Sequence, residues 1–172
     1  VGMGADTQIA EKTFTTAVGA ALKVFGTLGS QDAIIAFPLA DVKDRDVNWA
    51  VRALVIAANE LEHRTDTQKS KKDPAQAGVR KIVIAADAAN AATQLKGTLA
   101  QAIAISNGMA LTKELGNLSP NVCTPTYLAN TARQLADEYG FEIEVLERKQ
   151  LEALKMGSFL SVAKGSDEAP KF

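Results

Sequence analysis

The chain has 172 residues, of which 47% are hydrophobic and 23% charged, a balance typical of folded globular proteins rather than disordered ones. Its 19 basic and 20 acidic side chains give a formal net charge of -1, so its overall charge does not favour nucleic acid or an anionic membrane as a partner. A single cysteine excludes an internal disulfide, and no apolar run is long enough for a transmembrane helix.

The first half of the chain alternates helical and strand patterns. Apolar and small residues recur at helical spacing over residues 9–25 and again over residues 47–61. Two short apolar runs, 33–37 and 81–85, are typical of buried strands. Because strands alternate with helices that can cover them, the sequence predicts an α/β fold with a mostly parallel sheet.

A long helix is predicted over residues 88–115. Besides its apolar stripe, it carries a second line of small residues that includes Gly97 and Gly108. Each glycine costs about 1 kcal/mol relative to alanine, so we expect another element to approach the helix closely there. A helix that is apolar or small nearly all round is buried on several sides. We expect it to lie between two domains, and an ordinary core helix of one domain is the alternative.

Residues 114–128 predict a sharp junction. Gly116 can supply the left-handed position that ends a helix. The Ser-Pro pair at 119–120 forces an extended residue before the proline. The Thr-Pro pair at 124–125 is typical of the N-cap and first residue of a new helix.

The residues after the junction repeat the alternation of helix and strand. A helix over residues 126–139 is ended by Gly140. Alternating apolar and acidic residues over 141–146 predict a strand with one wet face. A short helix over 148–155 and an apolar strand over 159–163 follow. We therefore expect the first β/α elements of a second α/β domain, although a sheet of two strands is marginal by itself.

The chain offers few candidates for catalysis. His63 is the only histidine, and we expect an exposed side chain stabilised at a helix C-terminus; a catalytic partner of Ser or Cys is the alternative. Cys123 is expected to be a small buried thiol, with a reactive thiol as the alternative. One His and one Cys far apart in the sequence do not predict a zinc site. The carboxylate pairs Glu142/Glu144 and Asp137/Glu138 are expected on solvated faces.

Two further features could contact phosphate. The glycine-containing run 1–4 resembles half of a phosphate-binding turn, but it lacks the third glycine and a Walker lysine. A polar stretch, 62–78, is predicted to be a solvated loop and holds Lys69, Lys71 and Lys72. These lysines could contact a nucleic-acid backbone, although a solubilising role is the simpler interpretation.

The junction also carries a family resemblance. Residues 107–128, supported by residues 154–166, closely resemble bacterial leucyl aminopeptidases, also called cytosol aminopeptidases. The first half of the chain fits this family only loosely. With glycines at its start and Pro-Lys-Phe at its end, the chain is expected to be an internal segment of a longer protein. The resemblance implies three parts: 1–92, the latter part of a macrodomain-like N-terminal domain; 93–118, an interdomain linker helix and elbow; and 119–172, the incomplete start of the catalytic domain.

The resemblance implies a parent enzyme that removes N-terminal residues, leucine preferred, from peptides. Two divalent ions, Mn or Zn, would activate a water and polarise the scissile carbonyl. The parent would be a cytoplasmic homohexamer that does not bind a membrane, and some bacterial relatives also bind DNA. The family's metal-binding motifs, Asp-Thr-Gly-Gly and Asn-Thr-Asp-Ala-Glu-Gly-Arg, occur nowhere in these 172 residues.

No catalytic, metal-binding or cofactor-binding residue is therefore predicted in this chain. By itself the chain is expected to be inactive, with a role in joining and positioning domains. The alternative is a stand-alone α/β binding or regulatory module for nucleotide or DNA.

Overall fold

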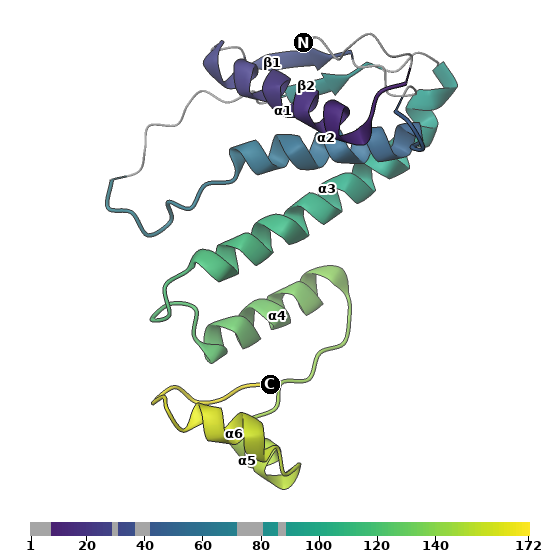
Figure 1. Ribbon diagram of the computed structural model, residues 1–172. Helices are drawn as coiled ribbons and strands as arrows, with labels where there is room; N and C mark the ends of the chain where they lie inside the picture. Colours follow the sequence, from purple (N-terminus) through teal and green to yellow (C-terminus); the bar gives the residue numbers. More distant parts are fainter. Residues whose placement is uncertain (1–7, 29–30, 37–41, 72–80, 86–88) are drawn as a thin grey trace. The chain divides into compact units, whose positions relative to one another are not determined.

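The computed structural model describes residues 8–28, 31–36, 42–71, 81–85 and 89–172 (Figure 1). The chain divides into two compact units, Val1–Lys113 and Glu114–Phe172. Within the described ranges, no helix combines the length and the apolar character needed to cross a membrane.

The N-terminal unit contains a small parallel sheet and the helices packed with it. Helix α1 (Glu11–Thr27) is followed by strand β1 (Asp32–Ile35), and helix α2 (Val47–Glu62) is followed by strand β2 (Lys81–Ile84). The two strands pair in parallel, with Asp32 opposite Lys81 and Ile35 opposite Ile84. The α/β prediction for this part of the chain, with its helix–strand order and parallel pairing, is confirmed.

Apolar side chains from α1 and α2 form the centre of this unit. The two helices pack along each other (Figure 1), and Phe14 and Leu54 are almost completely buried between the elements. The other buried members of the cluster come from α1 and α2 themselves, from strand β1, from the bridging residues Ile9 and Val42, and from the next helix: Ile9, Val18, Leu22, Ile35, Val42, Ala50, Val51, Val55, Leu95 and Ala102. Their helical spacing is the pattern that predicted α1 and α2.

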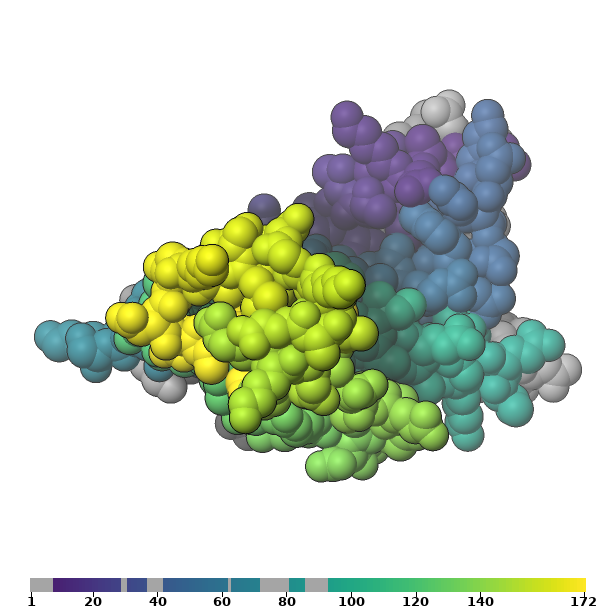
Figure 2. Space-filling model, turned by 90° about the horizontal axis from the view of Figure 1, so that it is seen from below, coloured from purple at the N-terminus to yellow at the C-terminus, as the bar shows by residue number. Residues whose placement is uncertain are grey.

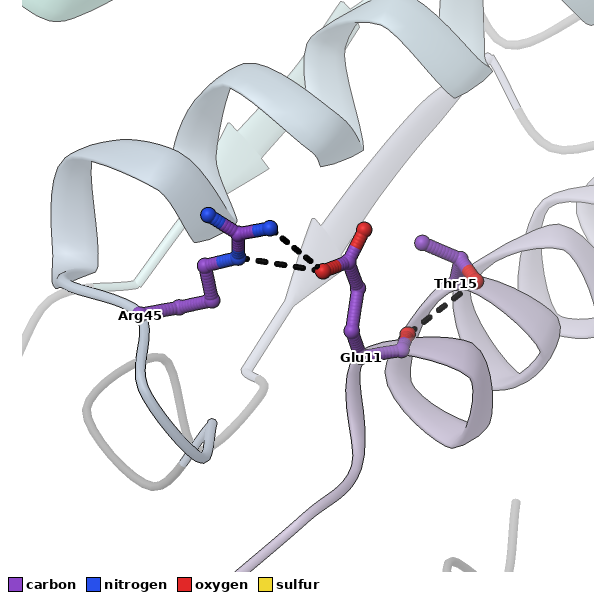
Figure 3. Close-up of polar contacts among 3 residues, drawn as sticks. All are labelled: Glu11, Thr15 and Arg45. Carbon is purple, nitrogen blue, oxygen red and sulfur yellow. Dashed lines mark hydrogen bonds and ion pairs between the residues drawn. The ribbon is translucent and has the colours of Figure 1, made fainter.

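A polar contact on the surface joins the start of α1 to the segment before α2 (Figure 3). Arg45 donates from Nε and Nη2 to Glu11 Oε2, at 3.0 and 2.8 Å, while Thr15 Oγ1 donates to the Glu11 carbonyl at 3.1 Å. The Arg45 guanidinium also lies 5.3 Å from the centre of the Trp49 ring. Because the ion pair is exposed, it contributes at most about 1 kcal/mol and serves mainly to fix the loop.

Asp46 caps the N-terminus of α2, and this cap makes a testable contribution to stability. Its side chain accepts the Trp49 backbone N–H at 2.8 Å. We expect Asp46→Ala to lower the free energy of unfolding by about 1 kcal/mol. Asp46→Asn is the matched control, because asparagine caps about as well and does not titrate. Urea unfolding followed by the fluorescence of Trp49, the only tryptophan, measures both variants.

The same cap gives the stability a pH dependence. The Trp49 N–H and then the Asn48 side chain hold the pKa of the Asp46 carboxyl below its usual value of 3.8. A carboxyl with a lowered folded-state pKa stabilises the fold above its unfolded-state pKa. That contribution is lost as the pH falls from 3.8 through the folded-state pKa. The Asp46→Asn variant should lack this component of the acid transition, and an unchanged acid transition would contradict the assignment.

Helix α3 (Ala89–Asn117) confirms the predicted long helix and runs two residues beyond its predicted end. Two details of the prediction are wrong. Gly116 lies within the helix and does not take the predicted left-handed conformation. Among the described residues, the glycine in that conformation is Gly140. In the described part of the chain, nothing comes within 4 Å of a Cβ built on Gly97 or Gly108, so no close approach occurs at these positions.

Among the α3 residues whose burial the structure describes, the buried ones form one stripe within the N-terminal unit. Leu95, Thr98, Ala102 and Ser106 are buried at helical spacing. Leu99, Ile103 and Ile105 are exposed in this unit, and their burial against a second domain stays a prediction. Thr98 Oγ1 donates to Asn48 Oδ1 at 2.6 Å, which ties this stripe to the start of α2.

The C-terminal unit is helical in the described structure. It contains α4 (Pro125–Tyr139), α5 (Arg148–Ala153) and α6 (Gly157–Ala163). The predicted strand over 141–146 is not formed; only an isolated antiparallel bridge joins Glu147 to Lys171. The predicted strand over 159–163 is also wrong, because these residues belong to α6.

Both errors have a physical cause. A short apolar run such as 159–163 fits a helix as well as a strand by periodicity alone. The alternating segment 141–146 would need a neighbouring strand to satisfy its backbone, and only Leu146 has such a partner, exchanging hydrogen bonds of 2.8 and 3.1 Å with Phe172. The buried residues of this unit are few: Ala129, Ala136, Leu151 and Pro170. Leu154, Val162 and Phe172 are exposed; this end of the chain is yellow in Figure 2.

Candidate functional site

The junction after α3 is a compact turn held by backbone hydrogen bonds. The Leu118 N–H donates to the Glu114 carbonyl at 3.0 Å and completes the end of the helix. The N–H groups of Val122 and Cys123 then donate to a single acceptor, the Ser119 carbonyl, each at 2.9 Å. Because one carbonyl accepts both bonds, the chain reverses within a few residues of the end of α3.

The start of α4 is fixed in the predicted way. Thr124 is the N-cap: its Oγ1 accepts the Tyr127 N–H at 3.2 Å, and its carbonyl accepts the Leu128 N–H at 3.0 Å. Pro125 occupies the first turn, where a missing N–H has no cost. The junction is therefore a helix end, a tight turn and a capped helix start, an arrangement suited to fixing geometry rather than to chemistry.

Two glycines of this unit should respond in opposite ways to alanine. Gly140 ends α4 with φ of 72°, a left-handed conformation in which alanine is strained, so Gly140→Ala should destabilise the unit by about 1–2 kcal/mol. Gly116 is helical with open space around its Cβ position, so Gly116→Ala should stabilise by up to about 1 kcal/mol. Thermal unfolding followed by circular dichroism compares them. Destabilisation by Gly116→Ala would instead indicate that Gly116 takes the left-handed conformation predicted from the sequence.

Cys123 lies within the turn and is half-buried. Its N–H is bonded to Ser119, and the described structure gives its thiol no acidic or basic partner. Nothing here assembles a nucleophile with a base, which is what a reactive thiol would require.

His63 differs from its predicted environment. It is the C-cap of α2, as expected, with its N–H bonded to the Asn59 carbonyl at 3.1 Å. The side chain is half-buried rather than exposed, and its Nε2 atom is enclosed with no hydrogen-bond partner. The reason is that the ring lines a small pocket between α2 and α3, opposite Ser106.

The pocket brings together polar residues that sequence reasoning did not connect. Ser106 is 3% exposed, and its Oγ also lacks a partner. Lys113 Nζ donates to Glu60 Oε1 at 2.9 Å beside them. The available signal was weak: Ser106 falls on the buried stripe of α3, where a polar residue needs an explanation.

The pocket does not suit peptide hydrolysis. Its cavity volume is about 10 Å³, room for about one water molecule and not for a peptide. The nearby carboxylate of Glu60 is paired with Lys113, so it does not orient His63 as the acid of a triad would. A serine and a histidine could form a catalytic pair. Here, however, the pocket has no space for a peptide, and no acidic side chain orients His63.

A wider groove runs along α1 and α2. Its cavity volume is about 630 Å³, and its lining is mostly apolar, with Lys23, Arg52 and Glu60 as its charged members. Ligand sites combine an apolar lining with polar groups that converge on one point. No side chain lining this groove has a buried polar atom without a partner.

The residues described by the structure do not fit a metal centre. No group of three or more His, Cys, Asp or Glu side chains in these ranges could hold an ion. Glu142 and Glu144 are exposed in a segment without regular structure, and Asp137 and Glu138 are exposed on α4. No catalytic step is therefore assigned to a metal bound by these residues.

The lysine loop is described only in part. Lys69 and Lys71 are exposed, and the Lys69 N–H donates to the Asp66 carbonyl at 3.0 Å. Lys72 and residues 1–4 lie outside the described residues. Contact of this loop with nucleic acid stays a prediction.

Comparison with known proteins relates both units to one family. Residues 1–72 match the model of the cytosol aminopeptidase family, N-terminal domain, and residues 110–172 match that of the cytosol aminopeptidase family, catalytic domain. The chain is 53% identical over 172 residues to a "Probable cytosol aminopeptidase" of Herminiimonas arsenicoxydans and 46% identical over 174 residues to that of Paraburkholderia phymatum. All of this chain is covered in both alignments.

The chain spans about a third of the length of these curated relatives, 34% in each case. Among solved structures, it resembles "Bottromycin maturation enzyme BotP in complex with Mn" with a TM-score of 0.79. That alignment covers 99% of this chain and 34% of the other at 22% identity, which establishes likeness of fold.

Proposed function

Because this chain belongs to the cytosol aminopeptidase family, we propose that it is the domain-joining segment of a metal-dependent leucyl aminopeptidase. The parent enzyme would remove N-terminal residues, leucine preferred, from peptides with two divalent ions, Mn or Zn, in its catalytic domain. The 172 residues would hold the N-terminal and catalytic domains in register and supply none of the catalytic or metal-binding side chains.

One observation carries this proposal: helix α3 lies between the two family matches and continues into the second. The N-terminal domain match ends at residue 72 and the catalytic domain match begins at residue 110. Helix α3 extends without a break from Ala89 to Asn117, across the boundary between the compact units at Lys113. A continuous helix transmits orientation, because its hydrogen bonds fix every residue relative to the previous turn.

The absent metal motifs support the second half of the proposal. Neither Asp-Thr-Gly-Gly nor Asn-Thr-Asp-Ala-Glu-Gly-Arg occurs in this sequence. The relatives are called cytosol aminopeptidases, which supports a cytoplasmic location for the parent. We further propose that the parent assembles as a homohexamer and acts on peptides in solution.

The joining role is tested by a one-residue insertion in the whole enzyme. An alanine inserted between Lys113 and Glu114 would rotate the following residues by about 100° and shift them by about 1.5 Å. We expect loss of the assembled form and a decrease of about 100-fold in kcat/KM, since misplacement on the ångström scale has that effect. Analytical ultracentrifugation and leucine-anilide hydrolysis measure the two effects.

A glycine inserted between the exposed residues Ser70 and Lys71 is the matched control. It lengthens a surface loop, which is tolerated well because loop closure depends only weakly on length. An α3 insertion that behaves like the loop insertion would show that the helix does not set the relation between the domains.

A further inference from the structure

Two buried polar atoms face a common pocket in the N-terminal unit. His63 Nε2 and Ser106 Oγ are both enclosed, and neither has a hydrogen-bond partner. Buried polar groups in folded proteins are nearly always hydrogen-bonded, to protein or to ordered water. Two such atoms lining one cavity therefore point to a shared partner.

The pocket lies between matching faces of two helices. Its lining on α2 runs from Ile56 to His63 and on α3 from Ser106 to Lys113, each at spacings of three and four residues. These spacings place the side chains on one face of each helix over two turns. Met109 and Ile56 add apolar side chains to the lining, and the two unpartnered polar atoms are shielded from bulk solvent.

The size of the cavity limits which molecule it can hold. Its volume of about 10 Å³ is close to the minimum that holds one water. A water also needs two to four polar neighbours. His63 Nε2 and Ser106 Oγ supply two, and Asn59 and Glu60 line the same pocket.

We propose that this pocket binds one structural water molecule that bridges His63 and Ser106 and thereby fastens α3 to the end of α2. The water forms one hydrogen bond with His63 Nε2 and accepts another from the Ser106 hydroxyl. The bridge lies in the pocket that the exposed Glu60–Lys113 ion pair also lines, and its α3 residue, Ser106, is about two turns before the compact-unit boundary. An enclosed bridge contributes more here than the exposed pair, which is weakened by solvent.

A crystal structure of the unaltered chain tests the site directly. We expect an electron-density peak within about 2.7–3.2 Å of both His63 Nε2 and Ser106 Oγ. A pocket without such a peak would overturn the proposal. So would a direct hydrogen bond between the two side chains, because it would satisfy both atoms without a ligand.

The direction in which Ser106→Ala changes the stability provides an independent test. Ser106→Ala removes one partner of the water, so the urea midpoint followed by Trp49 fluorescence should fall. Thr112→Ala is the matched control: it removes an exposed hydroxyl from the same half of α3 and gains similar helix propensity. If the pocket is dry, Ser106→Ala instead relieves an unsatisfied hydroxyl and raises the midpoint. A midpoint equal to or above that of Thr112→Ala would overturn the proposal.

Discussion

Replacing Phe14 by alanine should remove about 3–5 kcal/mol from the stability of the N-terminal unit. Phe14 is 0% exposed, and its ring lies 5.8 Å from that of Trp49, centre to centre. It comes from α1 and packs in the cluster to which α2 and the strands contribute. The truncation therefore removes buried apolar surface and leaves a cavity at the place where the elements meet.

The stability lost in Phe14→Ala is large compared with the total free energy of unfolding of a domain. Native domains are stable by about 5–15 kcal/mol, so Phe14→Ala should unfold a substantial part of the population under mild denaturant. Urea unfolding followed by both far-UV circular dichroism and Trp49 fluorescence measures the change. Two probes are needed because Phe14 contacts Trp49 and its removal alters the fluorescence of the folded state.

The neighbouring residue provides the control. Thr15 is exposed, and its hydroxyl bonds to the carbonyls of Glu11 and Lys12 within the helix, each at 3.1 Å. Exposed substitutions of this kind change stability by no more than about 0.5 kcal/mol. A Phe14→Ala change as small as that of Thr15→Ala would mean that α1 does not form the centre of this unit.

The sequence predicted those elements whose signals are local. Helix α4 illustrates this, because Thr124, Pro125 and Gly140 act within one turn of the helix end they define. The long helix α3 was also predictable, since an apolar pattern of that length fits no strand. The family resemblance, which rested on residues 107–128, is confirmed by the catalytic-domain match over 110–172.

The errors arose where the outcome depends on distant residues. Residues 141–146 have the alternation of a strand, but pairing requires a neighbour, and only an isolated bridge from Glu147 to Lys171 is formed. Gly116 allows a left-handed helix end without requiring one, and α3 continues through it. Periodicity could suggest that α2 and α3 are amphipathic, but it could not show that His63 and Ser106 line one pocket.

The proposed role makes the chain a geometric component of an enzyme. Its junction is fixed by backbone bonds to Ser119 and by the Thr124 cap, and neither residue is placed beside a cluster of metal-ligating side chains in the described structure. The half-buried His63 has a structural environment in the N-terminal unit. The family is therefore recognisable in residues that would not perform the reaction.

Hydrolysis of leucine 4-nitroanilide by the purified 172-residue chain in the presence of Mn²⁺ or Zn²⁺ is the decisive assay for whether these residues lack the active centre. The positive control is a whole cytosol aminopeptidase that contains both metal motifs, assayed at the same concentration and metal supply. We expect no turnover by the 172-residue chain above a blank that contains the metal alone, and no metal binding by calorimetry. Sustained, metal-dependent turnover by this chain would contradict the claim that its residues lack the active centre.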